Sequence, residues 1–210
     1  MQRPMILLAS ASPRRAEILA QVGLPFRRVA MREVREDHPE HDPERLVAHL
    51  ARLKCAAAIL DGEALDGATY VFGADTVVVV EGDILGKPRD ASDAADMLRR
   101  LSGRVHHVYT GHALAAVIVG EGAPRLAQTR ERVARTEVTF AALDDATIAA
   151  YLATGEPFDK AGAYGIQGPG ALFIEGIAGE YFTVMGLSVR ALTALLGEFG
   201  WPVDTLLGAG

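Results

Sequence analysis

Residues 70–80 are the stretch that most constrains the fold of this chain. The run from Tyr70 to Val80 is rich in valine and almost continuously apolar, which predicts a strand with both faces buried. Such a strand lies within a sheet that helices cover on both sides. Other stretches carry the apolar periodicity of helices, and no linker composition separates them. The sequence therefore predicts a single α/β domain over residues 1–210.

Asp75 interrupts this apolar run, in the sequence Gly73-Ala74-Asp75-Thr76. A carboxylate inside a buried strand is costly unless it is paired, hydrogen-bonded or bound to a metal ion. Burial by a local turn is the structural alternative. We interpret Asp75 as a functional residue, because the expected strand offers it no local partner.

An anion site is predicted near the N-terminus, in residues 7–15. A short buried strand runs into a loop of small residues, with Ser12 in the place of a helix N-cap and Pro13 at the first helical position. Arg14 and Arg15 follow, where the partial positive charge of a helix start normally attracts Asp or Glu. Together with free backbone N–H groups, two arginines form a binding site for an anion such as phosphate. The alternative is a pair of solvated surface arginines.

Two lysines are further candidates for an anionic ligand. Lys54 lies at the edge of the apolar face of a helix expected over residues 43–60, so its amine reaches either solvent or an internal polar site. Lys87 stands between Gly86 and Pro88, so its neighbours restrict its position.

The remaining elements are predicted from caps, turns and apolar patterns. They are a hairpin turn at Gly82-Asp83, a helix from Asp90 to Gly103, strands at Val105–Val119 and Arg132–Phe140, a helix after Asp144 or Asp145, short strands at Ala171–Ile174 and Tyr181–Met185, and a last helix capped by Ser188.

Residues 155–170, called here the glycine segment, contain five glycines among sixteen residues. This density indicates positive φ angles or a close approach of the backbone to something else. The segment matches neither a P-loop nor a dinucleotide-binding fingerprint. Asp159 and Lys160 either pair with each other or contact a ligand.

Composition excludes several classes of protein. A formal net charge of −6 argues against a protein whose main partner is nucleic acid. The single cysteine, Cys55, leaves no internal disulfide framework and suits a reducing cytoplasm. No apolar stretch approaches the ~18 residues of a membrane span, and Met5–Ala9 is shorter than the ~7–15 apolar residues of a signal peptide. We therefore expect a cytoplasmic protein with neither a nucleic acid nor a membrane as partner.

The order and spacing of the motifs resemble those of the Maf-like nucleotide pyrophosphatases. The resemblance covers residues 5–199, and no single motif decides it. It rests on Ala9-Ser10-Ala11-Ser12-Pro13-Arg14-Arg15, Gly73-Ala74-Asp75-Thr76, Gly86-Lys87-Pro88, Leu101-Ser102-Gly103 with Tyr109-Thr110-Gly111, and Asp159-Lys160-Ala161-Gly162-Ala163-Tyr164-Gly165-Ile166-Gln167-Gly168.

The resemblance implies both a fold and an activity. The fold is a mixed, elongated, twisted sheet flanked by helices around a central cleft, related in architecture to the inosine triphosphate pyrophosphatases, in a protein that is usually a homodimer. The activity is hydrolysis of a nucleoside triphosphate between its α- and β-phosphates, giving the monophosphate and pyrophosphate. The version of the glycine segment with Lys160 and Gln167 resembles the branch that acts on dTTP and UTP, and modified pyrimidine triphosphates are further candidate substrates.

Roles for individual residues follow from the resemblance together with their chemistry. Asp75 is expected to act as a general base, as a ligand of Mg²⁺ or Mn²⁺, or as both through one water. Gln167 offers a donor and an acceptor to the imide edge of thymine or uracil. The catalytic residues are expected to be Asp75, Arg15 and Lys87, and the substrate-binding residues Ser10, Ser12, Arg14, Lys54, Thr76, Lys160 and Gln167.

The sequence departs from the family pattern at the expected metal site. Relatives usually carry an acidic pair in the loop after the second strand, and an ungapped count places Val34 and Arg35 there. Glu33 and Glu36 flank those positions, and we favour Glu36 as the second metal ligand. A weakened metal site is the alternative. It would suit a non-catalytic, nucleotide-binding regulator of cell division that acts through a protein partner.

Overall fold

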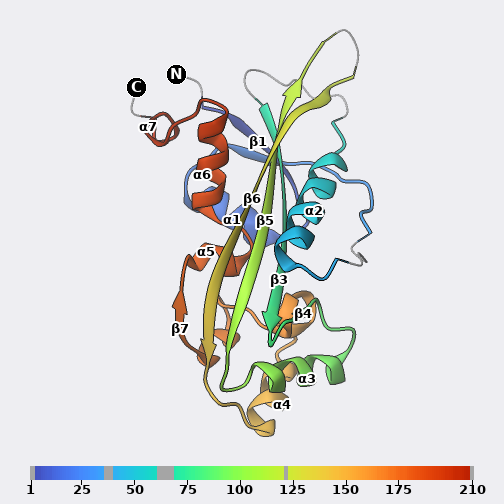
Figure 1. Cartoon of the computed structure of the whole chain (residues 1–210), viewed down its shortest axis with the longest axis vertical. Helices are drawn as coiled ribbons and strands as arrows, with labels where there is room; N and C mark the ends of the chain where they lie inside the picture. Colours follow the sequence, from blue (N-terminus) through green and yellow to red (C-terminus); the bar gives the residue numbers. More distant parts are fainter. Residues whose placement is uncertain (1–2, 36–39, 61–68, 121–122, 209–210) are drawn as a thin grey trace. The chain divides into compact units, whose positions relative to one another are not determined.

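The structure, a computed structural model, describes residues 3–35, 40–60, 69–120 and 123–208 (Figure 1). The described strands form one seven-stranded sheet with the order β2-β1-β3-β5-β6-β7, and β4 pairs with β3. The strands are β1 (Met5–Ala9), β2 (Phe26–Arg28), β3 (Thr69–Val80), β4 (Asp83–Leu85), β5 (Val105–Ile118), β6 (Arg125–Phe140) and β7 (Ile174–Ala178).

Helices connect these strands. The α-helices are α1 (Pro13–Gln21), α2 (Pro43–Ala56), α3 (Ala91–Leu101), α4 (Asp145–Ala153), α5 (Tyr181–Met185), α6 (Val189–Glu198) and α7 (Val203–Leu206). Three short 3₁₀ helices, η1 (Glu156–Asp159), η2 (Ala161–Ala163) and η3 (Pro169–Phe173), lie mostly in the glycine segment. None of the described helices is long and apolar enough to cross a membrane.

The sheet is mixed, as predicted. Strand β1 pairs in parallel with both β2 and β3, whereas the pairs β3–β4 and β6–β7 are antiparallel. The expected run at 70–80 is confirmed as β3, and eleven of its twelve residues are buried. Its position between β1 and β5 explains why both of its faces are apolar.

Contacts divide the chain into two compact units. Unit 1 contains Met1–Asp75, Gly111–Ala134 and Gly186–Gly210, and unit 2 contains Thr76–Thr110 and Arg135–Met185. Strands β3, β5 and β6 therefore supply residues to both units, and neither unit is one continuous stretch of chain. The assignment of a single domain stays a prediction.

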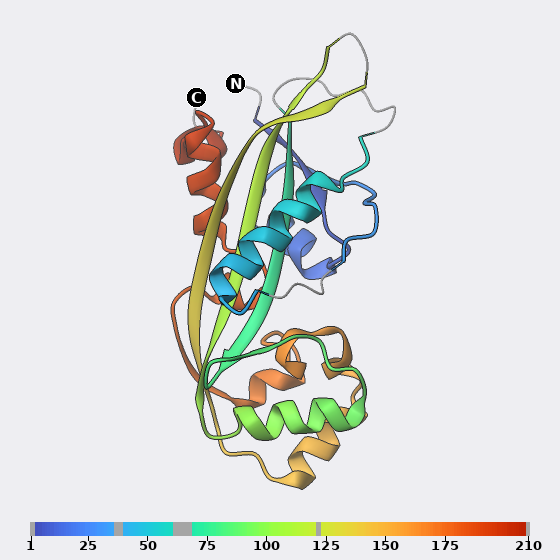
Figure 2. The same ribbon diagram turned by 45° about the vertical axis from the view of Figure 1, so that its right-hand side comes forward.

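In unit 1, helix α2 packs closely on the sheet because two strand positions have no side chain. A Cβ atom on Gly73 of β3 would lie 2.4 Å from the carbonyl oxygen of Ala51, and one on Gly111 of β5 would lie 2.2 Å from that of Val47. Figure 2 shows α2 lying across these strands. The two glycines therefore let the helix backbone contact the sheet directly.

Replacing Gly111 with alanine is expected to destabilise the protein by about 2–3 kcal/mol, since the added methyl group overlaps the backbone of α2. Gly197 is the matched control, because it lies on the exposed side of α6 with nothing within 4 Å of its added Cβ. There alanine favours the helix by about 0.5–1 kcal/mol. In urea denaturation, the midpoint of Gly111→Ala should fall below that of the wild type, and the midpoint of Gly197→Ala should rise above it. Equal midpoints would contradict the close packing of α2.

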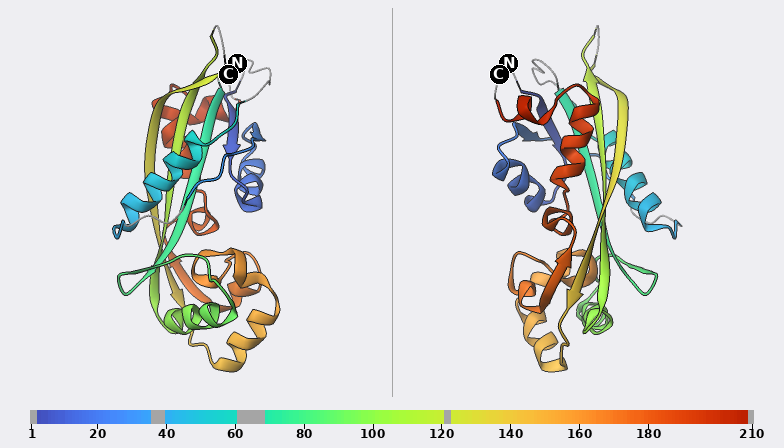
Figure 3. Two further views of the ribbon diagram at one scale, coloured as in Figure 1. Left: turned by 90° about the vertical axis from the view of Figure 1, so that its right-hand side faces the viewer. Right: turned by 60° about the vertical axis from the view of Figure 1, so that its left-hand side comes forward.

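The other face of the sheet in unit 1 is covered by α6 and α1. Figure 3 shows α2 and α6 on opposite sides of the strands. Tyr70 of β3 contacts Phe199 at the end of α6, and the indole nitrogen of Trp201 donates to the Tyr70 hydroxyl over 2.8 Å. Because successive residues of a strand face opposite sides of the sheet, Tyr70 faces α6 and Gly73 faces α2.

Unit 2 has its own core, built around aromatic side chains from four segments. Phe140 makes edge-on ring contacts with His106, Tyr164 and Phe173. His106 is fully buried and its Nε2 lies 2.7 Å from the Tyr164 hydroxyl. Burial lowers the pKa of His106 to about 4, so the ring is neutral at physiological pH. The aromatic cluster fixes Tyr164, which belongs to the glycine segment.

Most predicted helix starts are confirmed by their hydrogen bonds. The side chains of Asp90, Asp144 and Ser188 each accept a bond from a backbone N–H in the first turn of the helix that follows. The hairpin is confirmed, but its turn lies one residue earlier than the predicted Gly82-Asp83. The turn is formed by Glu81 and Gly82, both with positive φ, and Val80 pairs with Asp83.

Two predicted strands are wrong. Residues 181–185 form the helix α5, and residues 169–173 form η3, so that β7 begins only at Ile174. Both stretches contain β-branched and aromatic residues, which favour strands locally, but tertiary contacts override that preference. The second strand of the long pair also begins at Arg125 rather than at Arg132. Its first half is polar and largely exposed, and therefore lacks the apolar alternation of a strand.

Candidate active site

The loop between β1 and α1 positions Arg15. Its Nε donates to the carbonyl oxygen of Gly186 over 2.7 Å, and its Nη1 donates to the hydroxyl of Ser10 over 2.9 Å. Arg15 is 8% exposed, which excludes a solvated surface arginine at this position. The same Ser10 hydroxyl accepts from the backbone N–H of Ser12. A serine of the turn therefore orients the arginine.

Ser12 occupies the predicted N-cap position, but its side chain makes no capping bond. Pro13 begins α1, as predicted, and Arg14 is half-buried in the first turn. The first turn contains no acidic residue. Arg14 and Arg15 therefore add positive charge to the positive partial charge of this helix start.

A buried histidine holds the segment that orients Arg15. His112 of β5 is fully buried, and its Nε2 accepts from the backbone N–H of Ser188 over 2.8 Å. Its Nδ1 lies 3.2 Å from the carbonyl oxygen of Arg132, so the ring donates there and is the neutral tautomer. Burial, with a smaller contribution from the charge of Arg15, lowers the pKa of His112 to about 3. Gly186 is two residues before Ser188 and is thereby held in place.

Asp75 is paired with Lys54. The lysine Nζ lies 2.5 Å from Asp75 Oδ1, and the two side chains are 13% and 10% exposed. The contact follows from the close packing of α2, because Asp75 lies two residues after Gly73 and so points to the same helix. Of the two predicted alternatives for Lys54, the internal polar site is confirmed.

Asp75 lies in β3 at the level where β1 ends. Strands β1 and β3 are parallel, and Ala9 at the end of β1 pairs with Gly73. Ser10 therefore follows β1 at the level where β3 reaches Ala74 and Asp75. In parallel α/β sheets, ligands bind beyond the carboxyl ends of the strands, and β1 ends here. Unit 1 thus contains an oriented guanidinium, a buried carboxylate and an ammonium group, and the Ser10 that orients Arg15 lies at the level of Asp75.

In unit 2, Thr76 belongs to a chain of hydroxyl groups. Its Oγ1 lies 2.9 Å from the Oγ1 of Thr110, which in turn donates to the carbonyl oxygen of Thr183 over 2.8 Å. Thr110 and Thr183 are fully buried, whereas Thr76 is half-buried. Thr110 and the carbonyl of Thr183 therefore orient the hydroxyl of Thr76, which is a predicted substrate-binding residue. The sequence analysis gave neither of them a role.

The other predicted residues of unit 2 gather at the glycine segment. The backbone N–H of Gly162 donates to the carbonyl oxygen of Gly86 over 3.0 Å, so the segment contacts the motif that carries the exposed Lys87. Lys160 Nζ donates to Asp159 and to the carbonyl oxygen of Glu156. Of the two alternatives for Asp159 and Lys160, the structure shows the pairing, and contact of Lys160 with substrate stays a prediction. Gln167 is exposed.

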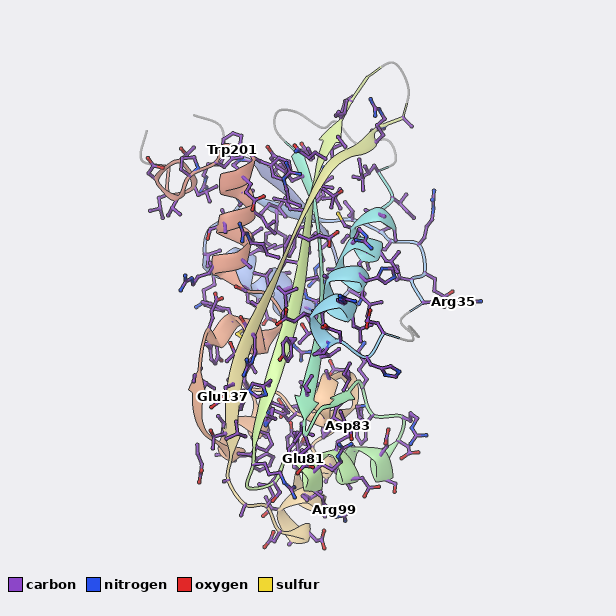
Figure 4. All side chains as sticks on the ribbon, in the orientation of Figure 1. Arg35, Glu81, Asp83, Arg99, Glu137 and Trp201 are labelled. Carbon is purple, nitrogen blue, oxygen red and sulfur yellow. The ribbon has the colours of Figure 1, made fainter. Side chains whose placement is uncertain are left out.

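At the expected metal site, Asp75 is the described residue that fits a divalent cation. Mg²⁺ is satisfied by one or two carboxylates together with phosphate oxygens and waters, and Asp75 is a buried carboxylate of that kind. Glu33 is exposed, and Glu36 lies outside the described residues. Within the part of the chain that the structure describes, no group of three or more His, Cys, Asp or Glu side chains could hold a metal ion. Arg35 is exposed and projects away from the ribbon (Figure 4).

Sequence reasoning missed three groups at these sites. Glu156 contacts the backbone of the glycine segment, Thr110 orients Thr76, and the carbonyl of Gly186 orients Arg15. Glu156 could have been noticed, because it stands within the glycine segment itself. A backbone carbonyl leaves no side-chain signal, so the role of Gly186 could not have been found.

Comparisons with known proteins identify the family of this chain. The profile of the family described as Maf-like protein matches residues 5–199. A protein of Aromatoleum aromaticum named dTTP/UTP pyrophosphatase is 47% identical over 94% of this chain and 97% of its own length. Proteins of the same name from Symbiobacterium thermophilum and Escherichia coli O157:H7 are 46% and 43% identical, over 95% and 92% of this chain and 96% and 92% of their own lengths.

A solved structure, that of the Staphylococcus aureus Ham1 protein, aligns with 91% of this chain and 90% of its own with a TM-score of 0.42 and 14% identity. Similarity at that level indicates nothing about activity. The family profile covers more than nine-tenths of the chain, and the relatives align over nearly their full lengths. The chain belongs to the Maf-like protein family.

Proposed function

We propose that this protein is a dTTP/UTP pyrophosphatase, which hydrolyses these nucleotides to the monophosphate and pyrophosphate. The observation that carries the proposal is the buried pair of Asp75 and Lys54, with Asp75 level in the sheet with the Ser10 that orients Arg15. Three relatives with 43–47% identity that are named dTTP/UTP pyrophosphatase support the choice of substrate.

Arg15, Arg14 and Lys54 are cationic groups suited to a triphosphate, which carries about four negative charges. The fixed guanidinium of Arg15 can donate to phosphate oxygens, and the start of α1 adds backbone N–H groups. These interactions stabilise the charge that develops on the pyrophosphate as it leaves.

Asp75 is proposed to accept a proton from the attacking water. The water oxygen then bonds to the α-phosphorus, the bond from that phosphorus to the bridging oxygen breaks, and pyrophosphate leaves with the electron pair. Lys54 donates to one carboxylate oxygen and so fixes the orientation of the base.

A divalent cation, Mg²⁺ or Mn²⁺, is proposed as the cofactor. Asp75 would hold it, together with Glu36 or Glu33 and the phosphate oxygens of the substrate. When bound, the cation supplies charge neutralisation and polarises the phosphate. A homodimer in the cytoplasm is proposed from the resemblance to the family.

The test is an assay of pyrophosphate release from a panel of triphosphates. With Mg²⁺ or Mn²⁺, the purified protein should release pyrophosphate from dTTP and UTP faster than from purine triphosphates, and EDTA should stop the release. No release from any pyrimidine triphosphate would disprove the proposal. Tight binding of dTTP without turnover would instead support the non-catalytic regulator, for which the exposed Arg35 at an expected acidic position is the observation in favour.

A further inference from the structure

The carboxylate of Glu156 lies against the backbone of the glycine segment. Its Oε2 accepts from the backbone N–H of Gly170 over 2.9 Å, fourteen residues further along the chain. Glu156 begins η1 and is half-buried. A carboxylate in such a position is satisfied by the backbone and does not need a ligand.

Two glycines of the segment are explained by this carboxylate. A Cβ atom on Gly168 would lie 2.1 Å from Glu156 Oε1, and one on Gly165 would lie 2.9 Å from the same atom. Neither glycine has a positive φ, so backbone freedom does not account for them. The Glu156 carboxylate therefore leaves no room for a side chain at 168. At 165 it does so together with Lys160, whose Cε would lie 2.8 Å from the added Cβ.

Tyr151 of α4 completes the arrangement. Its hydroxyl oxygen accepts from the backbone N–H of Gly165 over 3.2 Å. Burial, and after it a hydrogen bond to the Glu156 carboxylate, raises the pKa of Tyr151. The phenol therefore stays protonated, and its O–H donates a hydrogen bond to that carboxylate. Tyr151 is itself buried. The backbone at Gly165 and Gly170 is thus tied through Glu156 to a rigid helix.

Gln167 is an exposed residue that lies between the anchored backbone positions Gly165 and Gly170. It stands between Gly165 and Gly168, both of which contact the Glu156 side chain. Lys160 is held by the same residue, because its Nζ donates to the Glu156 carbonyl oxygen over 2.7 Å. The two residues of the segment with predicted contacts to substrate therefore both depend on Glu156 for their positions.

We propose that Glu156 is a positioning residue for base selection: its carboxylate fixes the backbone of residues 165–170 and thereby the direction in which Gln167 presents its amide. This inference rests on the proposed function. The imide edge of uracil or thymine is read by one donor and one acceptor, and such readout depends on the orientation of the amide. Glu156 acts through the backbone and does not itself contact the nucleotide.

The experiment compares Glu156→Ala with Glu156→Gln. Loss of the carboxylate leaves the N–H of Gly170 and the Tyr151 hydroxyl without their acceptor, so Glu156→Ala should raise KM for dTTP about tenfold. Its kcat should change less than threefold, and the preference for dTTP over dCTP should fall. Glu156→Gln keeps one acceptor oxygen and should recover most of this preference.

Asp144→Ala is the matched control. Asp144 caps α4 in the same unit by accepting from the backbone N–H of Thr147, a residue of that helix. Its loss should lower the melting temperature while leaving KM and base preference unchanged. If Glu156→Ala does not fold, Tyr151→Phe replaces it, because that variant keeps the ring and removes only the hydroxyl. It should raise KM for dTTP about threefold.

Hydrogen exchange of residues 163–170 separates failure of this inference from failure of the proposed function. Amides of that segment should exchange faster in Glu156→Ala than in the wild type, whether or not the protein hydrolyses dTTP. A wild type without activity would disprove the proposed function, and the exchange rates would still decide the anchoring. Unchanged exchange, an unchanged base preference, or a loss confined to kcat would overturn the inference.

Discussion

Replacing Asp75 with asparagine is expected to lower kcat/KM for dTTP by about 10²–10⁴-fold, as for removal of a general base. Asparagine has nearly the same shape but neither accepts a proton at neutral pH nor binds a hard cation as a carboxylate does. Its amide oxygen still accepts from Lys54, whose Nζ lies 2.5 Å from Asp75 Oδ1, so the variant should stay folded. Pyrophosphate release and a thermal melt measure the two effects separately.

Lys54→Met tests whether the loss of kcat/KM in Asp75→Asn comes from Asp75 itself or from its ion pair with Lys54. If Asp75 only holds Lys54 in place, Asp75→Asn should lose less activity than Lys54→Met, because its amide oxygen still accepts from Lys54. If Asp75 is the base, Asp75→Asn should lose much more than Lys54→Met. Asp83→Asn is the control, because Asp83 forms an exposed ion pair with Arg100 on the surface of unit 2 and should have no effect. Normal turnover by Asp75→Asn would contradict the assignment.

Replacing Arg15 with lysine is expected to lower kcat/KM by about 10²–10³-fold, although the positive charge remains. The guanidinium is oriented by two bonds, from Nε to Gly186 and from Nη1 to Ser10. A lysine ammonium cannot reproduce this fork, so it cannot present donors to a phosphate in the same geometry.

Arg14→Lys is the matched control for Arg15→Lys. The two arginines are adjacent in α1, but Arg14 is half-buried whereas Arg15 is 8% exposed. Arg14→Lys should lose less than tenfold, mainly through KM. Equal losses in the two variants would show that only charge matters. In that case the bonds to Gly186 and Ser10 would have no role in catalysis.

Much of the fold could be predicted because local signals agreed with the tertiary structure. The apolar run at 70–80 is a central strand, and the helices that begin after Asp90 and Asp144 do so through the predicted caps. Prediction failed at residues 181–185, where aromatic and β-branched residues form a short helix. It also failed in the first half of β6, which pairs through its backbone although its side chains are polar and exposed.

The candidate site was predictable where a residue type was unusual for its surroundings. A carboxylate in a buried strand and two arginines at a helix start are both costly without a partner, and the structure gives Asp75 and Arg15 such partners. The groups that orient the site residues could not be predicted, because they act through contacts between residues distant in sequence. The carbonyl of Gly186 and the carboxylate of Glu156 belong to this class.

The bond between Arg15 and Gly186 links the beginning of the chain to a residue 171 positions later. A ribosome adds about 5–20 residues per second, so Arg15 is made many seconds before its partner. During that time the nascent chain contains residues 9–15 but cannot hold Arg15 in its final geometry. A message that ends before Gly186 would yield a chain with most of the motifs and no oriented guanidinium. Completion of synthesis would thus itself decide when the protein begins to consume nucleotides.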